Sequence, residues 1–382
     1  MSEKVISPDL GFVNAVIKSG GESLKKCYQC ATCSVVCNVT PTDSPFPRKE
    51  MVQAQWGMKD ELFRNPDIWL CHQCSDCTAY CPRGAKPGEV LGAVRKLSIE
   101  HYSKPSFLAK MVGDSKFLVP LIAVPVVLFL IIIAAAGHLN LSAVPLGANG
   151  KVSFAEFLKP MPFVDLPMMA AMGFAVAMLF LGIMSYWKDM SKNAKPQGSL
   201  VGAIIGTVTD ILAHKKFAEC TVQKGRKTAH MLVFYSFLVL AATTTIAAIL
   251  EWAHVWTKLV GMSEESVHDA LYPPMKVLGN IGAVMLIIGI ILVIMNRKST
   301  AEKAGAGSYY DWLFINMVVV VGFTGFLAQL IRLAGIAKLA YIMYFIHLVS
   351  IFFLFAYAPY TKMAHMLYRG TAMVFAKMTG RG

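Results

Sequence analysis

The sequence has few charged residues for its length. Only 15% of its 382 residues are Asp, Glu, Lys or Arg, and its mean hydropathy is +0.53. Soluble proteins of ordinary composition carry about a quarter charged residues. The shortage excludes a wholly soluble chain and predicts that part of it lies in lipid.

The N-terminal sequence, MSEKVISPDLGFVNAV, lacks the basic and then apolar segments of a secretory signal peptide. We therefore expect the N-terminal region to stay in a reducing compartment, where disulfides are rare. The net charge of +13 would suggest nucleic acid in a soluble protein. Here the positive residues fall between apolar runs, where they set membrane topology. No nucleic-acid partner is expected.

Six apolar stretches follow Lys116, each about long enough for a membrane-spanning helix, which takes roughly 20 residues. They are Phe117–Gly137, Leu166–Trp187, Ala229–Leu250, Val277–Met295, Leu313–Ile331 and Ala340–Tyr360. Residues 88–99 and 198–218 are expected to be amphipathic helices outside these spans. The predicted fold is mainly α, with a polar head at 1–116 and a six-helix transmembrane bundle at 117–382.

Lys and Arg counts predict the orientation of the bundle. The connection at 188–228 carries eight, 296–311 carries three and the tail at 361–382 carries four, whereas 138–165 carries two and 251–274 carries one. Positive residues gather on the cytoplasmic side. We expect a multi-pass protein of the cytoplasmic (inner) membrane, with its head and its C-terminus in the cytoplasm.

Eight of the nine cysteines form two copies of the pattern C-x2-C-x2-C-x3-C, and each cysteine of the second copy lies 44 positions after its counterpart. In bacterial two-cluster ferredoxins of this spacing, the fourth cysteine of each motif binds the other motif's cluster. The spacing therefore predicts a ferredoxin-like head with two [4Fe–4S] clusters. The ligands would be Cys27, Cys30, Cys33 and Cys81 for the first cluster, and Cys71, Cys74, Cys77 and Cys37 for the second.

Structural zinc is the alternative for these cysteines. Zinc sites usually pair two C-x2-C units that are separated by a dozen or more residues. Two sets of four cysteines packed this tightly favour cuboidal clusters instead. Cys220 stands alone on the basic connection, and we interpret it as a structural or incidental thiol.

Four histidines are candidate ligands of haem b, in the order His230, His365, His347 and His214. A haem in a helical bundle needs two imidazoles at one depth, and His230 and His365 both lie at cytoplasmic ends of predicted spans. His347 lies within the sixth span, where an ionisable residue is a functional candidate by default. It precedes His365 by 18 residues, about 27 Å along a straight helix, which would put both on one side. One haem is expected; a second stays open because no further histidine lies within the third span.

The duplicated cysteine motif followed by this bundle resembles a fusion of two parts of heterodisulfide reductase, the iron–sulfur C subunit and the cytochrome b E subunit. That arrangement is found in the membrane-bound C subunit of the quinone-interacting membrane-bound oxidoreductase complex of sulfate-reducing organisms. The segment from His214 to Cys220, with Arg226 and His230 after it, resembles the sequence leading into a haem helix of that cytochrome family. Related nitrate-reductase gamma-like membrane domains hold two bis-histidine haems.

The resemblance implies a membrane electron-transfer subunit that is part of a quinone-linked oxidoreductase, with menaquinone as its substrate. Its implied partners are two soluble flavin and iron–sulfur subunits related to the A subunit of heterodisulfide reductase, and adenylylsulfate reductase in dissimilatory sulfate reduction. The sequence has no adjacent Cys-Cys pair, which agrees with a relay that does not itself reduce a disulfide.

Three other functions remain open. The same cofactors would suit the membrane anchor of a hydrogenase, heterodisulfide or sulfite-reduction complex. An ion-translocating redox protein would need pairs of acidic residues in the spans, and the spans are nearly free of Asp and Glu. A structural anchor that binds zinc would show no redox bands in a reduced-minus-oxidised spectrum. Quinol oxidation also needs a proton acceptor, but ordinary helix packing explains the polar residues of the bundle equally well, so no catalytic residue is assigned. Those residues are Asp210, Asn280, Asn316, Gln329 and Arg332.

Overall fold

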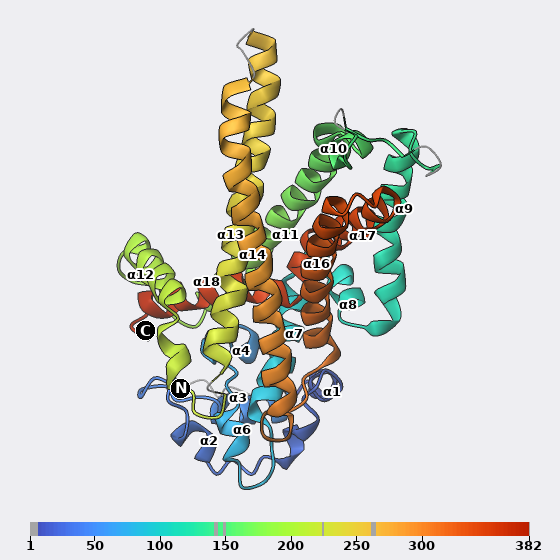
Figure 1. The fold of residues 1–382 in the computed structure, drawn as a ribbon. Coiled ribbons are helices and arrows are strands. Elements are labelled where there is room, and N and C mark those ends of the chain that lie inside the picture. Colours follow the sequence, from blue (N-terminus) through green and yellow to red (C-terminus); the bar gives the residue numbers. More distant parts are fainter. Residues whose placement is uncertain (1–6, 141–143, 148–149, 224, 261–264, 382) are drawn as a thin grey trace.

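The structure is a computed structural model that describes residues 7–140, 144–147, 150–223, 225–260 and 265–381; the side chains at 218, 251 and 253–273 are outside this description. All regular elements in the described residues are helical. The head lies at one end of a bundle of long helices, as Figure 1 shows. The predicted mainly α fold is confirmed.

The head is built from short helices joined by turns. They are α1 (Leu10–Lys18), η1 (Glu22–Lys26), α2 (Thr32–Val35), α3 (Arg48–Gln55), α4 (Lys59–Phe63), α5 (Asp67–Leu70), α6 (Asp76–Ala79), α7 (Pro87–Tyr102), α8 (Ser106–Val112) and η2 (Ser115–Phe117). Helix α7 contains the helix predicted at 88–99 and buries Val90, Leu91 and Val94 at its centre. It begins with Pro87, whose missing N–H costs nothing in a first turn.

The described residues contain six helices long and apolar enough to cross a membrane. These spans are Ser115–Ala135, Pro160–Met190, Arg226–Leu250, Pro274–Ser299, Tyr309–Leu333 and Ala337–Ala356. The elements that form them are α9 (Leu118–Ala135), η3 (Pro160–Asp165) with α11 (Leu166–Met190), α13 (Arg226–Val260), α14 (Glu265–Ser299), α16 (Tyr309–Leu333) and α17 (Ala337–Ala356). Each predicted apolar stretch corresponds to one of them.

Shorter elements connect the spans and close the chain. They are α10 (Phe154–Phe157), α12 (Leu200–Ala213), η4 (Lys215–Glu219), α15 (Ala301–Ala304), η5 (Ala358–Tyr360), η6 (Lys362–Ala364) and α18 (His365–Met378). Helix α12 is the amphipathic helix predicted at 198–218, and it packs against α18, where Asp210 pairs with Lys377 at 2.9 Å. Its apolar residues Val201, Ile205 and Val208 are exposed, as suits a helix at a membrane surface.

One hydrophobic core joins the head to the bundle. Trp69 of α5 stacks on Tyr368 of α18, with ring centroids 5.3 Å apart, and Tyr186 of α11 is fully buried beside them. Helix α5 leads directly into Cys71, so this core holds the second cysteine motif against α18.

The expected straight course of the sixth helix is wrong. Helix α17 ends at Ala356, two short 3-10 turns follow, and His365 begins α18, which runs across the bundle instead of along it (Figure 1). Pro359 offers no N–H to continue the hydrogen bonds of α17, and Thr361 is extended with its side chain capping the next turn. His347 and His365 therefore lie on different helices, and the separation of about 27 Å expected for a continuous helix does not apply.

Candidate functional site: cysteine motifs and a histidine-lined cavity

The two cysteine motifs have the same local backbone. Gln29 and Ala31 of the first motif have positive φ values of 61° and 67°, and their counterparts Gln73 and Ser75 have 52° and 69°. Non-glycine residues in this conformation cost about 1 kcal/mol or more each, and such strain gathers where a loop clamps a ligand. Each loop curls in the same way before a single helical turn that carries the third cysteine, α2 for Cys33 and α6 for Cys77.

The fourth cysteine of each motif lies with the first three of the other. Burial, and then the nearby charges of Cys27, Cys30 and Cys81, raise the pKa of Cys33 to about 11. The same thiols are the four that the spacing assigns to the first cluster.

The complementary group of thiols forms beside it. Burial raises the pKa of Cys37 to about 12, with smaller contributions from Cys71 and Cys74. The pKa of Cys77 is also raised by burial and by the charges of Cys71, Cys74 and Cys37. Eight thiols in two groups of four, each group mixing both motifs, fit the donor set of two [4Fe–4S] clusters.

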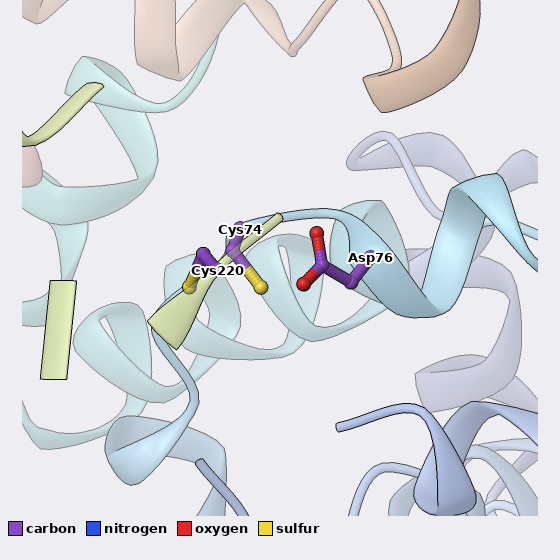
Figure 2. A group of neighbouring side chains, drawn as sticks. All are labelled: Cys74, Asp76 and Cys220. Atoms are coloured by element: carbon purple, nitrogen blue, oxygen red, sulfur yellow. The ribbon is translucent and has the colours of Figure 1, made fainter. Parts of the chain in front are cut away.

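Cys220 lies next to Cys74, one of the thiols of the second group. The sequence alone did not indicate this contact. Figure 2 shows it beside Cys74 and Asp76, and the ligand atoms of these three residues all lie within 4.8 Å of one another. A hydrogen bond from Cys220 lowers the pKa of Cys74 to about 7 and raises that of Cys220. Asp76 accepts from the backbone N–H groups of Thr221 and Val222 at 3.0 and 2.9 Å.

The group of Cys74, Asp76 and Cys220 does not suit a separate metal ion. The carboxylate of Asp76 already accepts from two backbone N–H groups, and Cys74 belongs to the second group of four thiols. The segment from Glu219 to Val222 contacts the second motif at Asp76 and the residue after the first motif, because Asn38 donates to the Glu219 carbonyl at 2.8 Å. The interpretation of Cys220 as a structural thiol agrees with this arrangement.

Three arginines from three elements converge on the backbone of the second motif. Arg95 of α7 donates to the carbonyls of Ile68 (2.5 Å) and Cys71. Arg226 of α13 donates to those of His72 and Gln73 at 2.6 and 2.7 Å.

Arg369 of α18 is the third of these arginines. It donates to the Cys71 carbonyl at 3.1 Å and to the Nε2 atom of His72 at 2.5 Å. Burial lowers the pKa of Arg369 to about 9, so the group stays charged near neutral pH. Burial and these cations also lower the pKa of His72, which therefore accepts as a neutral imidazole.

A cavity of about 2650 Å³ extends from this region into the bundle. Ligand pockets usually enclose about 300–1,000 Å³, so the space exceeds what one small ligand needs. Its wall includes all four predicted histidines, which are His214, His230, His347 and His365. It also includes Asp210, Asn280 and Gln329, so three of the polar bundle residues face this space.

His230 and His214 form a hydrogen-bonded pair on this wall. The Nδ1 atom of His214 lies 3.1 Å from the Leu212 carbonyl, which can only accept, so Nδ1 carries the proton of that ring. Its Nε2 atom then accepts from Nδ1 of His230, 3.1 Å away. This leaves the Nε2 lone pair of His230 available to a metal, with His214 as its orienting partner.

His365 and His347 have the same arrangement with different partners. Nδ1 of His365 contacts the Lys362 carbonyl. Nδ1 of His347 lies 3.1 Å from the Thr324 hydroxyl, which itself donates to the Val320 carbonyl at 2.6 Å and so must accept from the ring.

A glycine makes room for the deepest of these rings. A Cβ at Gly325 would lie 2.7 Å from Cε1 of His347, so a larger residue there would displace the imidazole. His230, His347 and His365 thus each have an Nε2 with no hydrogen-bond partner among the described residues, which suits axial ligation of haem iron. Burial also lowers the pKa of His365 to about 3, which keeps it in the unprotonated form that binds metal.

Comparisons with known proteins cover the head. Residues 23–85 match the family model of a 4Fe-4S dicluster domain. A protein of Archaeoglobus profundus that is named as similar to the C subunit of heterodisulfide reductase is 37% identical over 93 residues, which are 24% of this chain and 50% of that protein. The C subunit of the H2:CoB-CoM heterodisulfide,ferredoxin reductase of Methanothermobacter marburgensis is 33% identical over 110 residues, which are 28% of this chain and 57% of that protein.

The chain spans about half the length of the curated relatives it matches. No solved structure matches the chain. The matched region contains all eight motif cysteines, and the six apolar helices lie outside it. The chain therefore combines an iron–sulfur electron-transfer region with a multi-pass membrane region, and its N-terminal part resembles the iron–sulfur C subunit of heterodisulfide reductase.

Proposed function

We propose that this protein is a membrane electron-transfer subunit that links the menaquinone pool, through haem b and two [4Fe–4S] clusters, to soluble flavin and iron–sulfur subunits. The observation that carries the proposal is the cavity that runs from His72, Arg226 and Arg369 beside the second cysteine motif to His347 within the sixth span. One continuous space that passes beside the second cysteine motif and reaches His230, His365 and His347 suits electron transfer between lipid and water.

The proposal divides the chain at Lys116 into a two-cluster head (1–116) and a cytochrome b-type membrane domain (117–382). Cys27, Cys30, Cys33 and Cys81 would hold one cluster, and Cys71, Cys74, Cys77 and Cys37 the other. The grouping of their thiols across the two motifs supports this division of ligands. The bound clusters and haem would supply one-electron chemistry, and the chain positions them and tunes their surroundings.

His230 and His365 would hold one haem between α13 and α18, and His347 would serve a second haem or a quinone deeper in the bundle. The free Nε2 atoms of these rings support their role as ligands. His214, the fourth candidate, is assigned to orienting His230, because its own Nε2 accepts from that ring.

The head and C-terminus are proposed to lie in the cytoplasm, on the inner side of the membrane. The connection that carries eight Lys and Arg residues lies beside the head, since its Arg226 contacts the second motif and its Glu219 contacts Asn38. Positive connections mark the cytoplasmic side.

The finer identity rests on the resemblance between the fused head and bundle and the quinone-interacting oxidoreductase membrane subunit. It gives two proteins related to the A subunit of heterodisulfide reductase as partners, and adenylylsulfate reductase in sulfate reduction as the redox partner. A specific observation favours a second candidate, the relay of a heterodisulfide reductase complex, because relatives of the head carry that name. Purification of the native complex would distinguish the two by the subunits that remain bound.

The decisive experiment is anaerobic purification of the chain followed by iron and haem counting and a reduced-minus-oxidised spectrum. We expect about eight iron atoms in clusters and at least one haem b per chain. His365→Ala should abolish the haem that it shares with His230, and Cys77→Ser should remove one cluster. A colourless protein that binds only zinc would contradict the proposal.

A further inference from the structure

The two cysteine motifs share a backbone but have different charged surroundings. The carbonyls of the second motif accept hydrogen bonds from Arg95, Arg226 and Arg369, all half-buried on the cavity wall. The three side chains come from three separate elements, so their convergence depends on how the head docks on the bundle.

The corresponding positions of the first motif have weaker partners. The Gln29 carbonyl, the counterpart of Gln73, accepts from the exposed Arg48 at 2.9 Å. The Cys27 carbonyl, the counterpart of Cys71, accepts from the neutral amide of Gln55 at 2.9 Å. Cys30 is itself exposed to solvent, whereas its counterpart Cys74 is covered by Cys220.

Negative charge near the second motif offsets only part of this difference. Asp76 lies against Cys74, where the first motif has Thr32, but two backbone N–H groups bind its carboxylate. Burial by itself disfavours the extra negative charge that a cluster gains on reduction. The first motif also has two guanidinium groups nearby, those of Arg48 and Arg83, but both are exposed, and solvent screens exposed charges more strongly than half-buried ones. Three half-buried guanidinium groups against one carboxylate therefore leave the second motif with the stronger positive surroundings.

Two of these arginines also belong to the helices that carry the histidines. Arg226 precedes His230 by four residues on α13, and Arg369 follows His365 by four on α18. Residues four apart share one face of a helix. Each helix therefore presents a histidine to the cavity and, one turn away, an arginine to the second motif.

We propose that Arg95, Arg226 and Arg369 raise the reduction potential of the second cluster above that of the first and make it the cluster coupled to the His230–His365 site. The inference rests on the proposed function, because it concerns the clusters that the cysteines would hold. Hydrogen bonds and nearby charge are among the features that set cluster potentials. Each cluster takes up a single electron, and no bond forms or breaks in this step.

The expected effect is large enough to measure. At an effective dielectric constant of about 20, a unit charge within about 8 Å changes the reduced-to-oxidised ratio more than tenfold, and tenfold corresponds to about 59 mV for one electron. Removing the charge of Arg226 or Arg369 should therefore lower the higher of the two cluster potentials by at least that amount.

The test is an anaerobic potentiometric titration of the purified full chain with dithionite, followed by electron paramagnetic resonance. The wild-type chain should give two cluster potentials, and R226Q and R369Q should each lower the higher one and leave the lower one nearly unchanged. R48Q is the matched control at the first motif, and it should shift only the lower potential, by less than tenfold in the reduced-to-oxidised ratio. Iron content is measured first for each variant.

Lysine variants separate charge from packing. R226K and R369K keep the charge, so the higher potential should stay close to that of the wild type. If a glutamine variant loses iron, the lysine variant at the same position is measured in its place. Equal shifts in the lysine and glutamine variants, or a shift of the lower potential alone, would overturn the inference. Absence of both cluster signals from the wild-type chain would instead contradict the proposed function.

Discussion

The first cysteine motif faces solvent, and the second lies between the head and the bundle. Tyr28 and Val35 of the first motif are 67% and 82% exposed, whereas Cys71 and His72 of the second are buried. Their backbones share the same left-handed positions 44 residues apart. A duplicated sequence thus repeats local structure, but each copy acquires its electrostatic surroundings from the elements packed against it.

The largest expected effect tests whether the two motifs exchange their fourth cysteines. Cys37 belongs to the first motif in sequence, yet its thiol lies with those of Cys71 and Cys74. Cys37→Ser should remove the second cluster and about half of the cluster iron, and Cys81→Ser should remove the first. Iron analysis shows whether one cluster is lost. Adding R226Q to each cysteine variant then identifies the cluster that remains, because R226Q is expected to shift only the potential of the second cluster. Loss of the first cluster in Cys37→Ser would mean that each motif holds its own cluster.

The comparison extends to the two histidines beside the second motif. His230→Ala should abolish the haem that this histidine shares with His365, because an axial ligand is lost. His214→Ala should retain haem with roughly 10- to 100-fold weaker affinity, since it removes only the orienting partner of His230. Haem titration of both variants, read by the difference spectrum, checks this order. Full haem loss in His214→Ala with retention in His230→Ala would reverse the assignment.

A buried carboxyl behind the second motif makes stability depend on pH. Burial raises the pKa of Glu50 to about 7, and its Oε2 atom has no hydrogen-bond partner among the described residues. Between its unfolded value near 4.5 and about 7, the unfolded chain releases the proton and the folded chain keeps it. The contribution of Glu50 to stability therefore falls as pH rises through this window, by at most about 3 kcal/mol, and stays level above it.

Glu50→Gln should remove this pH dependence. Its amide oxygen can still accept from Asn65, which lies 2.9 Å from Oε1 of Glu50. The measurement is the difference between the anaerobic thermal midpoints of the wild type and the variant from about pH 5 to 8, because buried histidines such as His72 and His365 titrate in the same window and affect both proteins equally. Parallel pH profiles for the wild type and the variant would rule Glu50 out as the cause.

The smallest expected effect concerns Cys220, the thiol present at the second motif only. Cys220→Ala removes a hydrogen bond to Cys74 but no cluster ligand, so iron content should stay the same. Only the second cluster's potential should shift, by less than in R226Q, because a neutral thiol is replaced. Loss of one cluster in this variant would make Cys220 a ligand.

The sequence by itself determined the two cysteine motifs of the head and the six apolar helices of the rest. Cysteine spacing and 20-residue apolar runs are local properties, and local chain geometry turns them into thiol clusters and spanning helices. The break between α17 and α18 was missed, although Pro359 is a local signal for it.

Only the tertiary structure decided which residues meet across the chain. Arg226 contacts Gln73 over 153 positions, Arg369 contacts Cys71 over 298, and Cys220 lies beside Cys74. An apolar run specifies insertion into lipid but not how a helix is rotated or which helix it packs against. The pairing of His214 with His230, and the different surroundings of two motifs with the same cysteine spacing, depend on that packing.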